Sequence, residues 1–106
     1  MVRVVLLDSQ LRYITKVEIS KGTVNASFAW PRKIFRPAIT HSSFAFALVH
    51  NHPSGCVSPS DADLRLTKRI ASGARILQIK FLDHVIVGQA IADRPGYFSF
   101  QEAGLL

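Results

Sequence analysis

The strongest constraint on the fold is an uninterrupted apolar run, Phe44 to Val49, which polar residues follow at once. The run is rich in Phe and is too short for most helices, so it predicts a buried strand within residues 42–50. A strand that is apolar at successive positions is typical of sheets covered on both faces. We therefore expect a central strand flanked by helices, with polar side chains at its end.

The segments before this strand predict a hairpin and a short helix. Residues 3–8 and 13–20 are rich in β-branched side chains on either side of a polar turn. Residues 23–30 are expected to run extended up to Pro31, because a proline discourages helix in the residue before it. Residues 31–41 follow as a helix candidate that Pro37 breaks or distorts.

The segment after the strand, residues 58–79, predicts a long helix with a clear start. Ser58 is expected as the N-cap, with Pro59 at the first helical position and Asp61 three residues after the cap. Asp63 falls on the same side as an inward-facing apolar stripe, which consists of Leu66, Ile70, Ala74 and Leu77. Residues 79–88 predict a further strand, and residues 92–100 predict a turn at Pro95 and Gly96 followed by a short final strand. The expected class is therefore α/β (α+β), with a mixed sheet flanked by helices.

Composition limits the classes of protein that are possible. With 106 residues the chain is expected to form one domain, residues 1–106, and no apolar run approaches the roughly 18 residues of a membrane span. No secretory signal is evident, and the single cysteine, Cys56, has no internal disulfide partner, so we expect a cytoplasmic protein. The net charge of +6 is scattered along the chain, which is compatible with plain solvated faces or with a DNA-binding surface.

The stretch "HNHPSGCVSPSDAD" carries the candidate chemistry. His50 and His52 lie two residues apart at the strand end, which places both imidazoles on one face, about 6.6 Å apart along the chain. The next helix is expected to bring Asp63 toward them. Three such ligands leave one position of a zinc ion to water, as in hydrolases. The alternative is two hydrogen-bonded or solvated histidines and an aspartate that only stabilises a helix N-terminus.

The same stretch resembles the HxH-x7-SxxD motif of the JAMM/MPN metalloproteases, and more narrowly that of the RadC-like JAB/MPN domains. The segments "GTVNAS", "PRKIFRPAI", "LDHVIVG" and "YFSFQEAGLL" are similar to RadC segments in order and interval, so the resemblance covers Val4 to Leu106. It implies a cytidine-deaminase-like, three-layer α/β/α sandwich with a mixed curved sheet and Zn²⁺ at a strand end.

The resemblance also implies roles for individual residues. His50, His52 and Asp63 correspond to the zinc ligands, and Ser60 to the hydroxyl that hydrogen-bonds the tetrahedral oxyanion. A donor of this kind stabilises charge that appears only in the transition state. The alternative for Ser60 is a second polar residue in the helix cap.

The general base of the JAMM mechanism is a glutamate, and here the chain departs from the family. RadC-like proteins usually read "HPRE" where this chain reads "WPRK", so Trp30 and Lys33 replace a histidine and a glutamate. Glu18 is the upstream candidate for the base, and a solvated position on a strand explains it equally well. This chain can therefore bind a metal without catalysing hydrolysis.

Two functions follow as hypotheses. The first is a zinc metalloprotease-like hydrolase in which water on the metal attacks an amide or isopeptide bond, in the DNA repair context that the RadC resemblance implies. The second is a catalytically inactive module that binds DNA or a protein partner. Of the remaining residues, His84 is expected to be a buried, hydrogen-bonded histidine, and Cys56 a loop residue beside the metal. The sequence indicates no membrane contact and specifies neither the substrate nor the oligomeric state.

Overall fold

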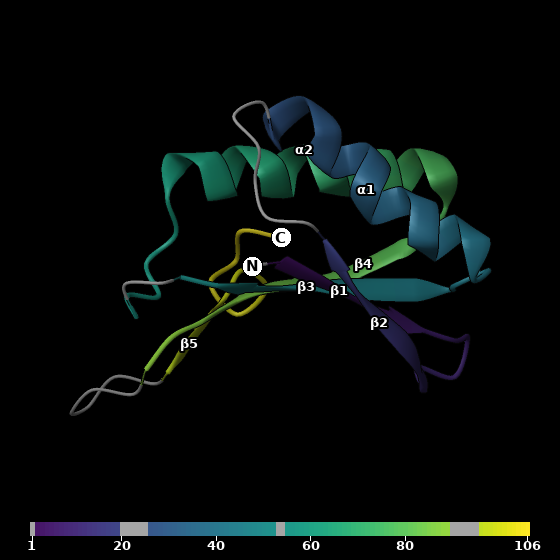
Figure 1. The fold of residues 1–106 in the computed structure, drawn as a ribbon, viewed down its shortest axis with the longest axis horizontal. Coiled ribbons are helices and arrows are strands. Elements are labelled where there is room, and N and C mark those ends of the chain that lie inside the picture. The colour runs from purple at the N-terminus through teal and green to yellow at the C-terminus, as the bar shows by residue number, and fades with distance from the viewer. Residues whose placement is uncertain (1, 20–25, 53–54, 90–95) are drawn as a thin grey trace.

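The computed structural model describes residues 2–19, 26–52, 55–89 and 96–106, with the backbone alone for residues 26–30 (Figure 1). The elements, in chain order, are β1 (Val2–Leu7), β2 (Tyr13–Ile19), α1 (Ala26–Thr40), β3 (Ala45–Asn51), α2 (Asp61–Leu77), β4 (Lys80–Val87) and β5 (Tyr97–Ser99). The predicted hairpin, the central strand, the long second helix and the two later strands are therefore present. No helix in these ranges is long and apolar enough to cross a membrane.

The five strands form one mixed sheet in the order β2-β1-β3-β4-β5. β3 pairs in parallel with β4, and the other neighbouring strands pair antiparallel. The crossover between the two parallel strands is α2. This arrangement confirms the α/β class with a mixed sheet, and it places the carboxyl end of β3 in the middle of one sheet edge. Ligand sites of open α/β sheets lie at such carboxyl ends.

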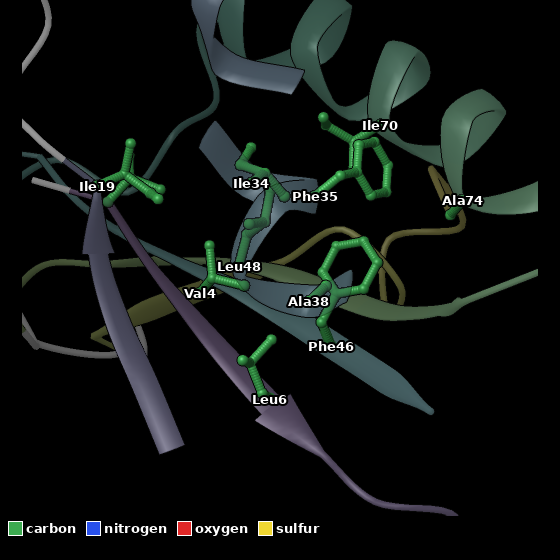
Figure 2. Packing of buried hydrophobic residues seen from close by; sticks show 11 residues of the cluster. Val4, Leu6, Ile19, Ile34, Phe35, Ala38, Phe46, Leu48, Ile70 and Ala74 are labelled. Atoms are coloured by element: carbon green, nitrogen blue, oxygen red, sulfur yellow. The ribbon is translucent and has the colours of Figure 1, made fainter. Parts of the chain in front are cut away.

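Both helices cover the same face of the sheet (Figure 1). Val4, Leu6, Phe46 and Leu48 point from the sheet into a core that α1 completes with Ile34, Phe35 and Ala38, and α2 with Ile70 and Ala74 (Figure 2). The helices approach closely at Gly73, where a Cβ atom would lie 2.8 Å from the Phe35 ring. Burying each large apolar side chain contributes about 1.5–3 kcal/mol of transfer free energy to the stability of this core.

The described part of the chain shows two of the three layers of the expected α/β/α sandwich. Within the described residues, both helices are used on one side, so these residues form two layers, a sheet and a pair of helices. The opposite face carries the residues that alternate with the core positions, including Val5, Val49 and Val85, which are partly exposed. The apolar face of the sheet is about four strands wide, so both helices are needed to cover it. No helix in the described ranges therefore remains for the other face.

Two local predictions are also corrected. Residues 26–30 continue α1 rather than running extended to Pro31, and both Pro31 and Pro37 lie inside the helix; residues 23–25 are outside the described ranges. The buried stripe Ile34, Phe35 and Ala38 stabilises the helix through packing, which outweighs the roughly 3 kcal/mol that an interior proline costs. In α2, Leu77 is 43% exposed instead of buried, because it lies at the last helical position.

Candidate metal centre

Three side chains converge at the carboxyl end of β3: His50 in the strand, His52 just after it and Asp63 in the first turn of α2. One nitrogen or oxygen atom from each lies within 4.8 Å of the others. His50 Nδ1 is 3.3 Å from Asp63 Oδ1, and His52 Nε2 is 3.1 Å from Asp63 Oδ2. All three side chains are largely shielded from solvent, with 20%, 17% and 7% of their side-chain surface exposed. The structure thus brings together the three residues that the sequence proposed as ligands.

The start of α2 sets the position of Asp63. Ser60 is the N-cap: its Oγ accepts a hydrogen bond from the Asp63 backbone N–H at 3.0 Å, and its own backbone N–H donates to Asp63 Oδ2 at 2.9 Å. This is a capping box with an aspartate in place of the usual Glu or Gln. The sequence "SPSDAD" contains two overlapping Ser-x-x-Asp patterns, and the expected cap at Ser58 with Asp61 is wrong by two residues. The structure uses the second pattern, Ser60 to Asp63, in which the Asp63 carboxylate faces the two histidines.

His52 is oriented by the loop that follows it. Its Nδ1 lies 2.8 Å from the backbone carbonyl oxygen of Cys56. Because a carbonyl oxygen only accepts hydrogen bonds, Nδ1 must carry the proton. In the neutral imidazole, Nε2 then presents a lone pair to an Asp63 carboxylate oxygen 3.1 Å away. Two electron-pair donors at this distance require a cation or a proton between them, so the geometry fits a bound metal ion.

His50 brings a second ring nitrogen to the cluster. Its Nδ1 is buried and has no aligned hydrogen-bond partner among the described residues, although Asp63 Oδ1 is only 3.3 Å away. Burial lowers the pKa of His50, and the raising effect of Asp63 does not compensate for it. The imidazole is therefore neutral at pH 7, which is the form that binds metals.

Asp63 is the negative charge of the cluster. Burial raises the pKa of its carboxyl group, but the hydrogen bonds from Ser60 and the proximity of the two histidines outweigh burial and lower it. The carboxylate thus stays ionised at pH 7. Two imidazoles and one carboxylate form a donor set of nitrogen and oxygen atoms that suits zinc and other divalent first-row metals.

A buried chain of polar groups supports the cluster from behind. Thr67 Oγ1 donates to the Asp63 backbone carbonyl at 2.8 Å and lies 2.7 Å from His84 Nδ1. A hydroxyl has one proton, so with that proton on the carbonyl the His84 Nδ1–H donates to Thr67 Oγ1. The His84 ring stacks on Phe100 at a centroid distance of 4.5 Å, and it lies 6.0 Å from the His50 ring. Burial, followed by the proximity of His50, lowers the pKa of His84 to about 4.

Sequence reasoning anticipated His84 but missed Thr67. Thr67 is 1% exposed, and it lies one helical turn after Asp63 on the inward face of α2. The signal was available: a hydroxyl residue four positions after an inward-facing acid occupies the same stripe. It was overlooked because the apolar members of the stripe define the pattern.

Of the other candidate residues, Glu18 and Lys33 lie outside the three-ligand cluster, whereas Cys56 and Ser60 contact the ligands. Glu18 is exposed on β2 and alternates with Val17 and Ile19, which face the core, so its side chain lies on the opposite face of the sheet from His50. Lys33 lies in α1, and it lines a groove between α1 and β2. Cys56 is exposed and contributes its backbone carbonyl, as described above. Ser60 is exposed at the helix start, directly beside Asp63.

Comparisons with known proteins agree with the motif and the fold. The family model described as "RadC-like JAB domain" matches residues 1–105. Relatives include a UPF0758 protein of Trichlorobacter lovleyi, 45% identical over 101 residues, which cover 95% of this chain and 42% of the relative. A UPF0758 protein of Rubrobacter xylanophilus is 46% identical over 103 residues, which cover 97% of this chain and 43% of the relative. The chain thus spans less than half the length of these curated relatives, and it belongs to the RadC-like JAB domain family.

Proposed function

We propose that this domain is a zinc-dependent hydrolase of the JAMM type that cleaves an amide or isopeptide bond. The observation that carries the proposal is the convergence of His50, His52 and Asp63, whose ligand atoms lie within 4.8 Å of one another. Three ligands of this kind leave a coordination position open, which distinguishes catalytic from structural zinc sites. A zinc ion bound there supplies a Lewis acid that activates water and polarises a carbonyl group.

The residues that contact the proposed zinc ligands have specific roles in such a reaction. The Cys56 carbonyl fixes the ring of His52, and the Ser60 backbone N–H fixes the Asp63 carboxylate, so both ligands are held before a metal binds. The Ser60 hydroxyl uses a lone pair to accept from the Asp63 N–H, which leaves its proton free to donate. We assign that proton to the oxyanion that forms from the scissile carbonyl, as the family resemblance implies.

A second candidate function is metal binding without turnover, in a module that holds DNA or a protein partner. One observation favours it: among the described residues, the cluster holds a single carboxylate, Asp63, while Glu18 lies on the other face of the sheet. The position where the family usually carries its glutamate is Lys33, in α1. A DNA repair role, which the RadC resemblance implies, would rest on the net charge of +6 and fits either function.

The decisive test is cleavage of isopeptide-linked and linear peptide libraries by the zinc-loaded domain. Hydrolysis that a chelator abolishes and that Asp63→Asn removes would support the enzyme, and unchanged activity in Glu18→Gln would exclude Glu18 as the base. Full zinc occupancy without any cleavage would support the binding module instead. For that module, DNA affinity should fall steeply between 50 and 200 mM salt, by about 10³-fold or more if six or more phosphates are contacted.

A further inference from the structure

A cavity of about 460 Å³ opens beside the metal cluster and shares His52 with it. It lies where β1, β3 and β4 end or begin together, at the carboxyl end of β3. Polar side chains reach it from Arg3, Asn51 and Gln89, while Gly55 and Gly88 present backbone without side chains. This combination of open space and a few convergent polar groups is typical of ligand sites.

Arg3 provides the charge in this cavity. It alternates in β1 with Val2 and Val4, which are buried in the core, so its side chain emerges on the sheet face without helices. Its cross-strand neighbour is Glu18, yet the Arg3 guanidinium makes no hydrogen bond or ion pair with Glu18 or with any other described residue. Among the described residues that line the cavity, none is an acid. The guanidinium N–H groups of this partly buried arginine are therefore available to hydrogen-bond a ligand.

The wall of the cavity is built so that it stays open. Gly55 has a φ of +79°, a backbone conformation that favours glycine, and its N–H closes a turn onto the His52 carbonyl at 3.0 Å. A Cβ atom at Gly88 would overlap the Gly55 carbonyl oxygen and lie 2.7 Å from Val57. Gly88 thus lets the loop after His52 lie directly on the end of β4. The same loop orients His52 through Cys56, so the cavity and the metal cluster have a common wall.

We propose that this cavity is a subsite for a carboxylate of the substrate, an inference that rests on the proposed hydrolase function. An arginine fork matches the two oxygens of a carboxylate, and the side-chain amides of Asn51 and Gln89 can donate to the same group. A nucleic-acid backbone carries a charge at every nucleotide and is held by several cations, whereas Arg3 is the one lysine or arginine among the described residues of this lining. The substrate class is therefore a peptide or amide with a carboxylate near the scissile bond.

The test uses small probes, so it does not require the natural substrate. N-acetyl-L-glutamate and the neutral N-acetyl-L-glutamine amide, in which amides replace both carboxylates, are titrated into the ¹⁵N-labelled domain, both metal-free and zinc-loaded. The glutamate probe should shift the amide signals of Gly55, Gly88 and Gln89, and the glutamine probe should not. Arg3→Gln should weaken binding about tenfold or more, since a hydrogen bond to a charged group contributes about 1.5–3 kcal/mol. Lys16→Gln is the matched control, because Lys16 lies on the same sheet face but does not line the cavity.

Each other outcome overturns the proposal. Equal binding of the two probes, or an equal loss in Lys16→Gln, would mean that no specific carboxylate site exists. If inorganic phosphate or a short DNA duplex binds through Arg3 while N-acetyl-L-glutamate does not, the cavity is a site for a phosphate group and not for a carboxylate. Binding of the glutamate probe to the metal-free protein and to Asp63→Asn tests the carboxylate subsite separately from the hydrolase function. The subsite should still bind the probe there, even if the domain proves to bind no zinc.

Discussion

Two ends of one strand, β3, illustrate two ways of holding a structure together. Phe46, near its start, is fully buried between the Phe35 and Phe81 rings, at centroid distances of 5.7 and 4.9 Å. His50, four residues later on the same face, faces Asp63 and is backed by His84. The first end is stabilised by apolar area and is indifferent to pH and metal. The second is stabilised by hydrogen bonds and charge, so both pH and metal should change it.

The largest expected effect comes from removing apolar volume. Phe46→Ala deletes a ring that α1 and the neighbouring strand both contact, and such truncations cost about 3–5 kcal/mol of unfolding free energy. Urea-induced unfolding measures the loss. If the two ends of β3 are independent, the remaining folded protein should bind zinc with unchanged affinity. A large loss of zinc affinity in folded Phe46→Ala would show that the ends are coupled.

The pH dependence of stability tests the polar end. Burial lowers the pKa of His84 to about 4, so between pH 6.5 and 4 the unfolded chain binds a proton there that the folded chain does not. Stability of the metal-free protein should therefore fall as the pH falls through this window, by about 2 kcal/mol from His84 between pH 7 and 4.5. The control is His84→Gln, which keeps a hydrogen-bonding group beside Thr67 but does not titrate. Parallel pH profiles for the two proteins would contradict the assignment.

A smaller effect on stability is expected at the helix start. Ser60→Ala removes the side-chain cap of α2, which costs about 1 kcal/mol, but it keeps the backbone N–H that holds the Asp63 carboxylate. Zinc affinity should therefore change little. If Ser60 also stabilises the oxyanion, turnover should fall about 10²- to 10³-fold, far more than the stability change explains. A fall in turnover that merely follows the loss of folded protein would leave Ser60 with the cap alone.

The same contrast shows what the sequence could predict. The strand at Phe46 and the amphipathic helix after it follow from periodicity, and the convergence of His50, His52 and Asp63 follows from a strand, a turn and a cap in succession. The choice of Ser60 over Ser58 as the N-cap cannot be predicted in this way. The two Ser-x-x-Asp patterns overlap, and only the tertiary contacts of Asp63 decide between them.

The errors elsewhere have a common cause as well. Local rules end a helix at a proline, yet α1 runs through Pro31 and Pro37, since its apolar stripe packs on the sheet. Thr67 was missed because its importance lies in what it contacts, His84 from a distant strand.

The most direct test of the account is a zinc titration, by calorimetry with chelator competition, of three proteins: the unchanged domain, Asp63→Asn and Asp61→Asn. Asp61 and Asp63 lie in the same helical turn, but only Asp63 faces the histidines. We expect one zinc per chain and full affinity in Asp61→Asn. In Asp63→Asn the loss should exceed the roughly 10- to 100-fold that removing an outer-shell partner costs. Equal zinc affinity in the two variants, or no zinc binding by the unchanged domain, would contradict it.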